Sequence, residues 1–189
     1  MRQINRSFIS ALLFVCLLSS CKEDIPKDPV IPNEEELITT LYLNLMPGTG
    51  QLVTLSFEDL DGAGGAAPII KGGTLAPNTT YEGILTLFNE LEDPVGDISV
   101  EIEDEALDHQ FFFQTDIPGL DVSYNDQDSE GNPIGLRTII STPDSGSSGT
   151  LTITLRHEPD KDATGVSEGD ISNAGGETDI QVTFEIDVQ

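Results

Sequence analysis

Apolar and polar residues alternate one by one along the C-terminal segment 180–188, IQVTFEIDV. Because successive side chains of a β-strand point to opposite faces, this alternation predicts a strand with one buried face and one solvated face. The same alternation occurs in 41–45, 53–57 and 151–155. The chain is therefore predicted to build sheets from half-buried strands.

Further strands are predicted from apolar, β-branched and aromatic content at 79–89, 109–115, 119–125 and 135–141. In the second of these, three consecutive phenylalanines at 111–113 indicate a strand buried on both faces, the alternative being an exposed hydrophobic edge that binds a partner. Segments rich in Gly, Pro, Asp and Ser at 47–50, 126–132 and 143–149 predict the turns.

The sequence DISVEIEDEALD, which begins at Asp97, is the exception to the strand pattern. Asp97 suits an N-cap, and Ile98, Ile102 and Leu107 form an apolar stripe, so a short helix is favoured over a short alternating strand. Eight strands and one helix predict an all-β fold, an antiparallel β-sandwich of immunoglobulin-like type. A doubly wound α/β fold would need several helices.

The first twenty residues have the organisation of an export signal, with two arginines followed by an uncharged apolar run over 8–18. This run is too short for a membrane-spanning helix, which needs ~20 apolar residues. The sequence Leu18-Ser19-Ser20-Cys21 resembles a bacterial lipobox, the alternative being an ordinary signal peptide with a chance cysteine. Cys21 is therefore expected to carry acyl chains such as palmitate, which anchor the protein to a membrane.

Lys22-Glu23-Asp24 resembles the export signal that places lipoproteins of the Bacteroidota on the outer face of the outer membrane. The expected location is therefore the outer membrane, with the protein lipid-anchored and facing the cell exterior. Residues 21–36 contain three prolines and end in three glutamates, which predicts an extended tether. The folded β-sandwich domain is predicted over 37–189.

Composition excludes several classes of function. With 34 acidic and 8 basic residues, the chain has a formal net charge of −26, which repels phosphate backbones and excludes nucleic acid as a partner. The chain has no Trp and three Tyr to stack on sugar rings, which disfavours a glycan-binding role. Neither H-E-x-x-H nor C-x-x-C occurs. We therefore expect a binding protein and not an enzyme.

Two groups of residues are candidate cation sites. Alternate oxygen-bearing residues before a glycine turn are typical of calcium loops, in which six to eight oxygens converge on the ion. Here they are Asp126, Asp128, Glu130 and Asn132. The segment departs from the EF-hand pattern, because Arg137 stands where a bidentate Glu is required. The alternative is a polar hairpin turn.

The second group contains both histidines of the chain. If the predicted helix extends to His109, then Glu101, Glu105 and His109 share one face and can supply ligands to a transition metal. His157 and Glu158 stand together at the end of a predicted strand. Two imidazoles with one or two carboxylates would form a zinc-type site if the fold brings them together, the alternative being two unrelated surface histidines.

The segments GGTLAPNTTYEGILTLFNE, DHQFFFQT, YNDQDSEGNPIGL, GTLTITLRHEPDK and SNAGGETDIQVTFEIDV are similar to a family of uncharacterised flavobacterial lipoproteins. Members of this family sometimes have a generic type 1 periplasmic-binding label, which implies α/β lobes that the strand pattern here does not support. Surface lipoproteins of this group often act beside TonB-dependent receptors, so the resemblance implies such a receptor as a partner.

These observations predict a lipid-anchored, surface-exposed outer-membrane lipoprotein that acts as a binding module. Its expected ligand is a divalent metal, zinc at the histidines or calcium at the acidic loop, and its expected partner is an outer-membrane uptake receptor. The alternative is a structural or adhesion module in which calcium stiffens the acidic loops and no ligand is transported.

Overall fold

The computed structural model describes residues 36–62 and 64–189. The predicted signal peptide, Cys21 and the tether up to residue 35 lie outside the described residues. The described residues belong to one compact unit. No helix among the described residues is long and apolar enough to cross a membrane.

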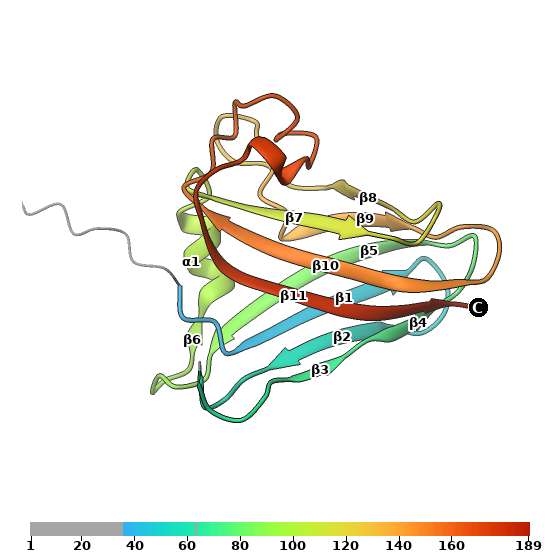
Figure 1. Ribbon diagram of the computed structural model, residues 1–189, viewed down its shortest axis with the longest axis horizontal. Helices are drawn as coiled ribbons and strands as arrows, with labels where there is room; N and C mark the ends of the chain where they lie inside the picture. Colours follow the sequence, from blue (N-terminus) through green and yellow to red (C-terminus); the bar gives the residue numbers. More distant parts are fainter. Residues whose placement is uncertain (1–35, 63) are drawn as a thin grey trace, which may run out of the picture. The chain divides into compact units, whose positions relative to one another are not determined.

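Two packed β-sheets form the body of the domain (Figure 1). The seven-stranded sheet contains β1 (Thr40–Pro47), β2 (Val53–Glu58), β3 (Ile69–Lys71), β5 (Thr80–Asn89), β6 (Gly96–Asp97), β8 (Asp121–Tyr124) and β9 (Arg137–Ser141). Its order is β3-β2-β1-β5-β9-β8, with β6 paired to β5. The second sheet contains β4 (Gly73–Leu75), β11 (Glu177–Val188), β10 (Ser147–His157) and β7 (His109–Thr115), in that order. The predicted all-β, antiparallel sandwich is confirmed.

The eight predicted strands are all present, and three more are added. The added strands β3, β4 and β6 have two or three residues each, too few for an alternation to be visible in the sequence. All neighbouring strands are antiparallel except β4, which pairs in parallel with β11.

The alternation seen in the sequence packs the core between the sheets. The three leucines of β1 and the apolar residues of β11 from Ile180 onward are buried on its two sides. In β7, Phe111 is buried in this core, whereas Phe112 points to the other face and packs with Val166 and Ala174 in a second, smaller cluster. The predicted burial of this strand on both faces is therefore confirmed.

The predicted helix is present as α1, Ile98–Asp104. The Asp97 carboxylate accepts a hydrogen bond from the Ser99 backbone N–H, and Ile98 and Ile102 are buried. Leu107 does not continue the stripe, because the helix ends at Asp104 and Leu107 is exposed. A short 3₁₀ helix, η1 (Ile171–Asn173), lies in the long connection between β10 and β11.

Three chain segments meet at the end of the sandwich beside α1. These are the start of β7, the end of β10 and the segment that leads into β1 (Figure 1). The start of β11 joins them because β11 pairs with β10 along its whole length. This end of the sandwich contains both histidines of the chain.

Candidate metal centre

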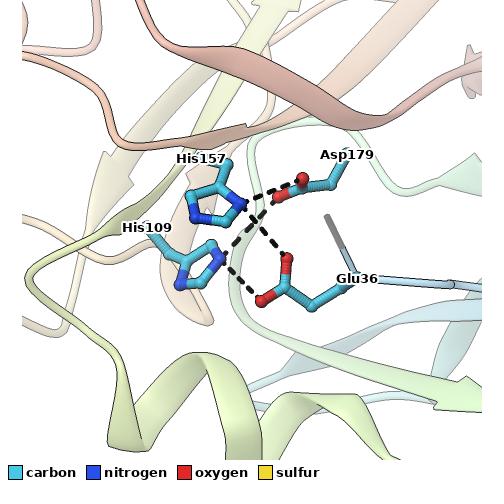
Figure 2. A group of neighbouring side chains, drawn as sticks. All are labelled: Glu36, His109, His157 and Asp179. Carbon is cyan, nitrogen blue, oxygen red and sulfur yellow. Dashed lines mark ion pairs between the residues drawn. The ribbon is translucent and has the colours of Figure 1, made fainter. Parts of the chain in front are cut away.

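Four side chains converge at this end of the sandwich: Glu36, His109, His157 and Asp179 (Figure 2). Each offers one nitrogen or oxygen atom, and these four atoms all lie within 4.8 Å of one another. His109, His157 and Asp179 belong to the four-stranded sheet, whereas Glu36 precedes β1 of the other sheet. The cluster therefore joins the two layers of the sandwich.

Strand pairing brings the two histidines together. His109 is the first residue of β7, His157 is the last residue of β10, and the two are direct cross-strand partners. Their ring centroids lie 4.8 Å apart. Side chains two residues apart share a face of a strand, and the neighbours at that spacing, Phe111 and Leu155, are buried in the main core. Both imidazoles therefore point to the same side of the sheet as the main core and lie at the end of that core.

A β-bulge turns Asp179 toward the histidines. Leu155 pairs with Ile180 and Arg156 pairs with Thr178, so Asp179 is the extra residue that has no cross-strand partner. Ile180 already points into the core, and regular alternation would send Asp179 outward. Because the bulge interrupts the alternation, the Asp179 side chain is instead fully buried. Bulges often redirect a side chain in this way near functional sites.

Glu36 completes the cluster from the segment that the sequence analysis assigned to the tether. Its side chain is only 6% exposed, and its carboxylate contacts both histidines. The folded unit therefore extends beyond the predicted boundary at Leu37. Neither Glu36 nor Asp179 was a predicted ligand.

The distances within the cluster match the size of a zinc site. Glu36 Oε1 lies 2.9 Å from His109 Nε2, and Glu36 Oε2 lies 3.8 Å from His157 Nδ1. Asp179 Oδ2 lies 3.8 Å from His109 Nε2, and Asp179 Oδ1 lies 3.6 Å from His157 Nδ1. In a tetrahedral zinc site with bonds of about 2.0–2.2 Å, neighbouring ligand atoms lie about 3.3–3.6 Å apart. Small movements of these side chains would give that geometry.

Several buried polar atoms of the cluster make no hydrogen bond. They are Glu36 Oε2, His109 Nε2 and both carboxylate oxygens of Asp179. The 2.9 Å contact between Glu36 and His109 has the length of a hydrogen bond but not the orientation of one. A buried polar group without a partner costs about 1–3 kcal/mol, so native proteins retain few of them. A cation bound by one atom of each residue would satisfy Glu36 Oε2, His109 Nε2 and one oxygen of Asp179.

Hydrogen bonding at the outer nitrogen of His109 fixes the orientation of this ring. His109 Nδ1 lies 3.2 Å from the backbone carbonyl oxygen of Glu105, just beyond the end of α1. Since a carbonyl only accepts, Nδ1 must carry the proton and donate it. Nε2 then faces the carboxylates with either a second proton or a lone pair. Metal-binding histidines are commonly held by such a backbone contact.

Burial and the neighbouring charges shift the pKa values of three groups. Burial raises the pKa of Asp179 to about 7, and the charge of Glu36 adds to the rise, while the histidines oppose it. Burial also acts to raise the pKa of Glu36, but the contact with His109 and the charges of both histidines hold it below its ordinary value. Burial acts to lower the pKa of His109, yet Glu36 holds it above its ordinary value. These groups thus compete for protons. A divalent cation bound between them would balance the charges of the two carboxylates.

The structure brings together the two predicted histidines but not the predicted glutamates. Because α1 ends at Asp104, Glu101 and Glu105 do not form a ligand stripe with His109, and Glu105 contributes its backbone carbonyl instead. Glu158 follows β10 with a positive φ of 49° and lies exposed outside the cluster. The acidic ligands thus come from other parts of the chain.

In the segment predicted as a calcium loop, two carboxylates already have other partners. Asp126 accepts hydrogen bonds from the backbone N–H groups of Gly135 and Arg137. Asp128 accepts from the backbone N–H groups of Glu130 and Asn132 and from Lys161 Nζ, which lies 2.9 Å away. A lysine ammonium therefore takes the place expected for a cation, and the loop is a lysine-centred turn.

One sequence pattern associated with catalysis, G-x-S-x-G, occurs at 165–169. In serine hydrolases this pattern forms a sharp turn from a strand into a helix, which presents the serine to a histidine. Here it lies in a run of turns between β10 and η1, and Ser167 is exposed with its hydroxyl donating to Glu168. The segment therefore lacks the strand–turn–helix context, and no histidine is beside Ser167, because both histidines belong to the cluster with Glu36 and Asp179.

Comparisons with protein-family models, with curated proteins and with solved structures find no match.

Proposed function

We propose that this chain is a lipid-anchored module that binds one divalent transition-metal ion, best matched by zinc, through Glu36, His109, His157 and Asp179. The observation that carries the proposal is the convergence of four buried ligand groups whose atoms lie within 4.8 Å of one another. Two imidazoles and two carboxylates form a donor set that suits zinc and related metals. Calcium is a poorer match because it takes six to eight oxygen ligands.

The number of ligands favours binding over catalysis. Catalytic zinc sites usually have three protein ligands and keep the fourth position for water or substrate. In this cluster four protein groups would fill a tetrahedral shell around a bound ion, and their side chains are between 0% and 6% exposed. Such a site holds an ion and presents no open coordination position to a substrate.

Anchoring is proposed from the sequence. Acylation of Cys21 would attach the domain to the outer membrane by the short segment 22–35, directly before the first metal ligand. We therefore propose a surface module that captures a metal ion beside the membrane, where a neighbouring uptake receptor would be a suitable partner.

Zinc titration tests the binding site. The chain from residue 21, with Cys21→Ser to prevent acylation, contains the whole compact unit. We expect calorimetry at slightly alkaline pH to show one zinc ion per chain. Loss of an outer-shell contact alone reduces metal affinity by ~10–100-fold, so Asp179→Asn, which removes a direct ligand charge, should reduce it by more than ~100-fold.

The matched control is Glu101→Gln, which removes an exposed acid of the predicted helix stripe and should leave zinc affinity unchanged. Circular dichroism of the Asp179→Asn variant shows whether the sandwich is retained, and His109→Gln provides an independent ligand change. Absence of stoichiometric zinc binding, or equal affinity in the wild type and both ligand variants, would contradict the proposal.

A further inference from the structure

Three of the four ligands are fixed within the strands of one sheet. His109 and His157 are cross-strand partners, and the next residues along β7 and β10 continue the same ladder. Asp179 lies in β11 between two residues that pair with β10. Moving any of these three ligands far would break backbone hydrogen bonds of the sheet.

Glu36 is held differently, because it lies outside every strand. Among the described residues, the attachments of its segment to the sheets follow it in sequence. Ile38 is buried in the core, and the Thr39 backbone N–H donates to the Phe88 carbonyl oxygen at 3.0 Å. Leu37, between Glu36 and these attachments, is 53% exposed. Glu36 can therefore move by rotation about Leu37 while the sheets stay intact.

A buried site needs a way for the ion to enter and leave. The side chains of His109 and Asp179 are fully buried, and those of Glu36 and His157 are 6% exposed, so the closed cluster offers no direct path to solvent. One ligand must move away before an ion can pass. Among the four, Glu36 is the ligand whose displacement breaks the fewest backbone contacts of the residues that the structure describes.

We infer that Glu36 is a movable strap over the metal site, and that the ion enters and leaves when the Glu36–Leu37 segment swings away. This inference rests on the proposed metal binding and adds its route of exchange. Because metal binding favours the position in which Glu36 contacts the histidines, the bound ion also holds the start of the domain, which the chain connects to Cys21. Pulling that segment away would conversely weaken metal binding.

Dissociation kinetics test the strap, with Leu37→Gly as the main variant. Glycine has greater backbone freedom, and Leu37 is exposed and is not a ligand, so the substitution loosens the strap without altering the donor set. We expect transfer of zinc to an excess of chelator to become about two- to fivefold faster. Leu52→Gly, at a similarly exposed position between β1 and β2, should leave the rate unchanged.

A second variant examines the ligand itself. Glu36→Gln keeps the shape of the side chain but removes its charge, and zinc release should become faster by ~10-fold or more. Zinc binding that depends on Asp179, together with identical release rates for the wild type and Leu37→Gly, would overturn the strap and leave the binding site standing. Absence of zinc binding to the wild type would overturn both.

Discussion

Lys161 shows how one buried charge can organise an acidic loop. Its ammonium lies 2.9 Å from Asp128 Oδ2 and also donates to the carbonyl oxygens of Ala106 and Pro133. Both side chains of the pair are almost fully buried. The ammonium thus links the turn after α1 to the loop between β8 and β9 and to the long connection after β10.

We expect Asp128→Asn to lower the free energy of unfolding by about 3–5 kcal/mol, because removal of one partner of a buried pair leaves the other charge uncompensated. Urea denaturation at neutral pH measures this loss. Glu130→Gln removes an exposed acid of the same loop and should change stability by less than about 0.5 kcal/mol. Equal stability of Asp128→Asn and the wild type would mean that the pair is not a structural link.

The same pair predicts a dependence on pH. Burial acts to raise the pKa of Asp128, but the hydrogen bond from Lys161, together with those from Asn132 and Glu130, holds the pKa below its ordinary value. A carboxylate with a lowered folded-state pKa stabilises the protein above its unfolded pKa of about 3.9, and this contribution is lost as pH falls through the folded value. The difference in stability between the wild type and Asp128→Asn should therefore shrink in this acid range.

At the scale of elements, helix α1 supports the candidate metal centre through the residue that follows its C-terminus. The helix is joined to the seven-stranded sheet by Ser99, whose hydroxyl accepts from the Leu87 backbone N–H. One residue beyond the helix, the Glu105 carbonyl accepts from His109. The helix thus fixes the orientation of one imidazole without contributing a side chain to the cluster.

We expect Asp97→Ala to destabilise the domain by about 0.5–2 kcal/mol, because it removes the side chain that accepts from the Ser99 N–H at the start of α1. Thermal unfolding followed by circular dichroism measures the change. Asp104→Ala is the matched control at the other end of the helix, where an acid opposes the helix dipole. That variant should be neutral or slightly stabilising. Equal losses in both variants would argue against a specific cap.

The strands and the helix were predictable because their periodicities are local. The alternation over 180–188 and the cap at Asp97 each depend on neighbouring residues only, and both are confirmed. The short strands β3, β4 and β6 were not predictable, because pairing with longer strands defines them. Local pattern thus identified the sandwich but not its complete strand set.

The candidate site was half predictable for a related reason. The chain has two histidines, so both were identified as candidate ligands. Their positions at the ends of predicted strands allowed them to lie side by side in a sheet. Asp179 was missed because regular alternation assigns it to the polar face, and only the bulge in the pairing of β11 with β10 reverses it. Glu36 was missed because three consecutive glutamates after a proline-rich stretch have the composition of a tether. The chain has 34 acidic residues, and nothing in the neighbouring sequence distinguishes a ligand carboxylate from the others.

At the scale of the whole molecule, the candidate metal site joins the two sheets at one end of the sandwich. Three ligands come from the four-stranded sheet and Glu36 comes from the start of the other, so a bound ion would act as a cross-link. The strong negative charge of the chain adds to this effect, because a divalent cation balances two carboxylates that otherwise repel each other.

We therefore expect zinc to stabilise the domain against heat. A ligand that binds only the folded state at 100 times its dissociation constant adds about 2.7 kcal/mol. For a domain of this size, that corresponds to a rise in Tm of about 5–10 °C. Differential scanning calorimetry with zinc and with excess chelator measures the shift, and Asp179→Asn should abolish it. Calcium at the same concentration should give little or no shift, because Lys161 already neutralises Asp128 in the acidic loop. A large calcium shift that persists in Asp179→Asn would instead favour a calcium-stiffened module, since the loops would then be the site of cation binding.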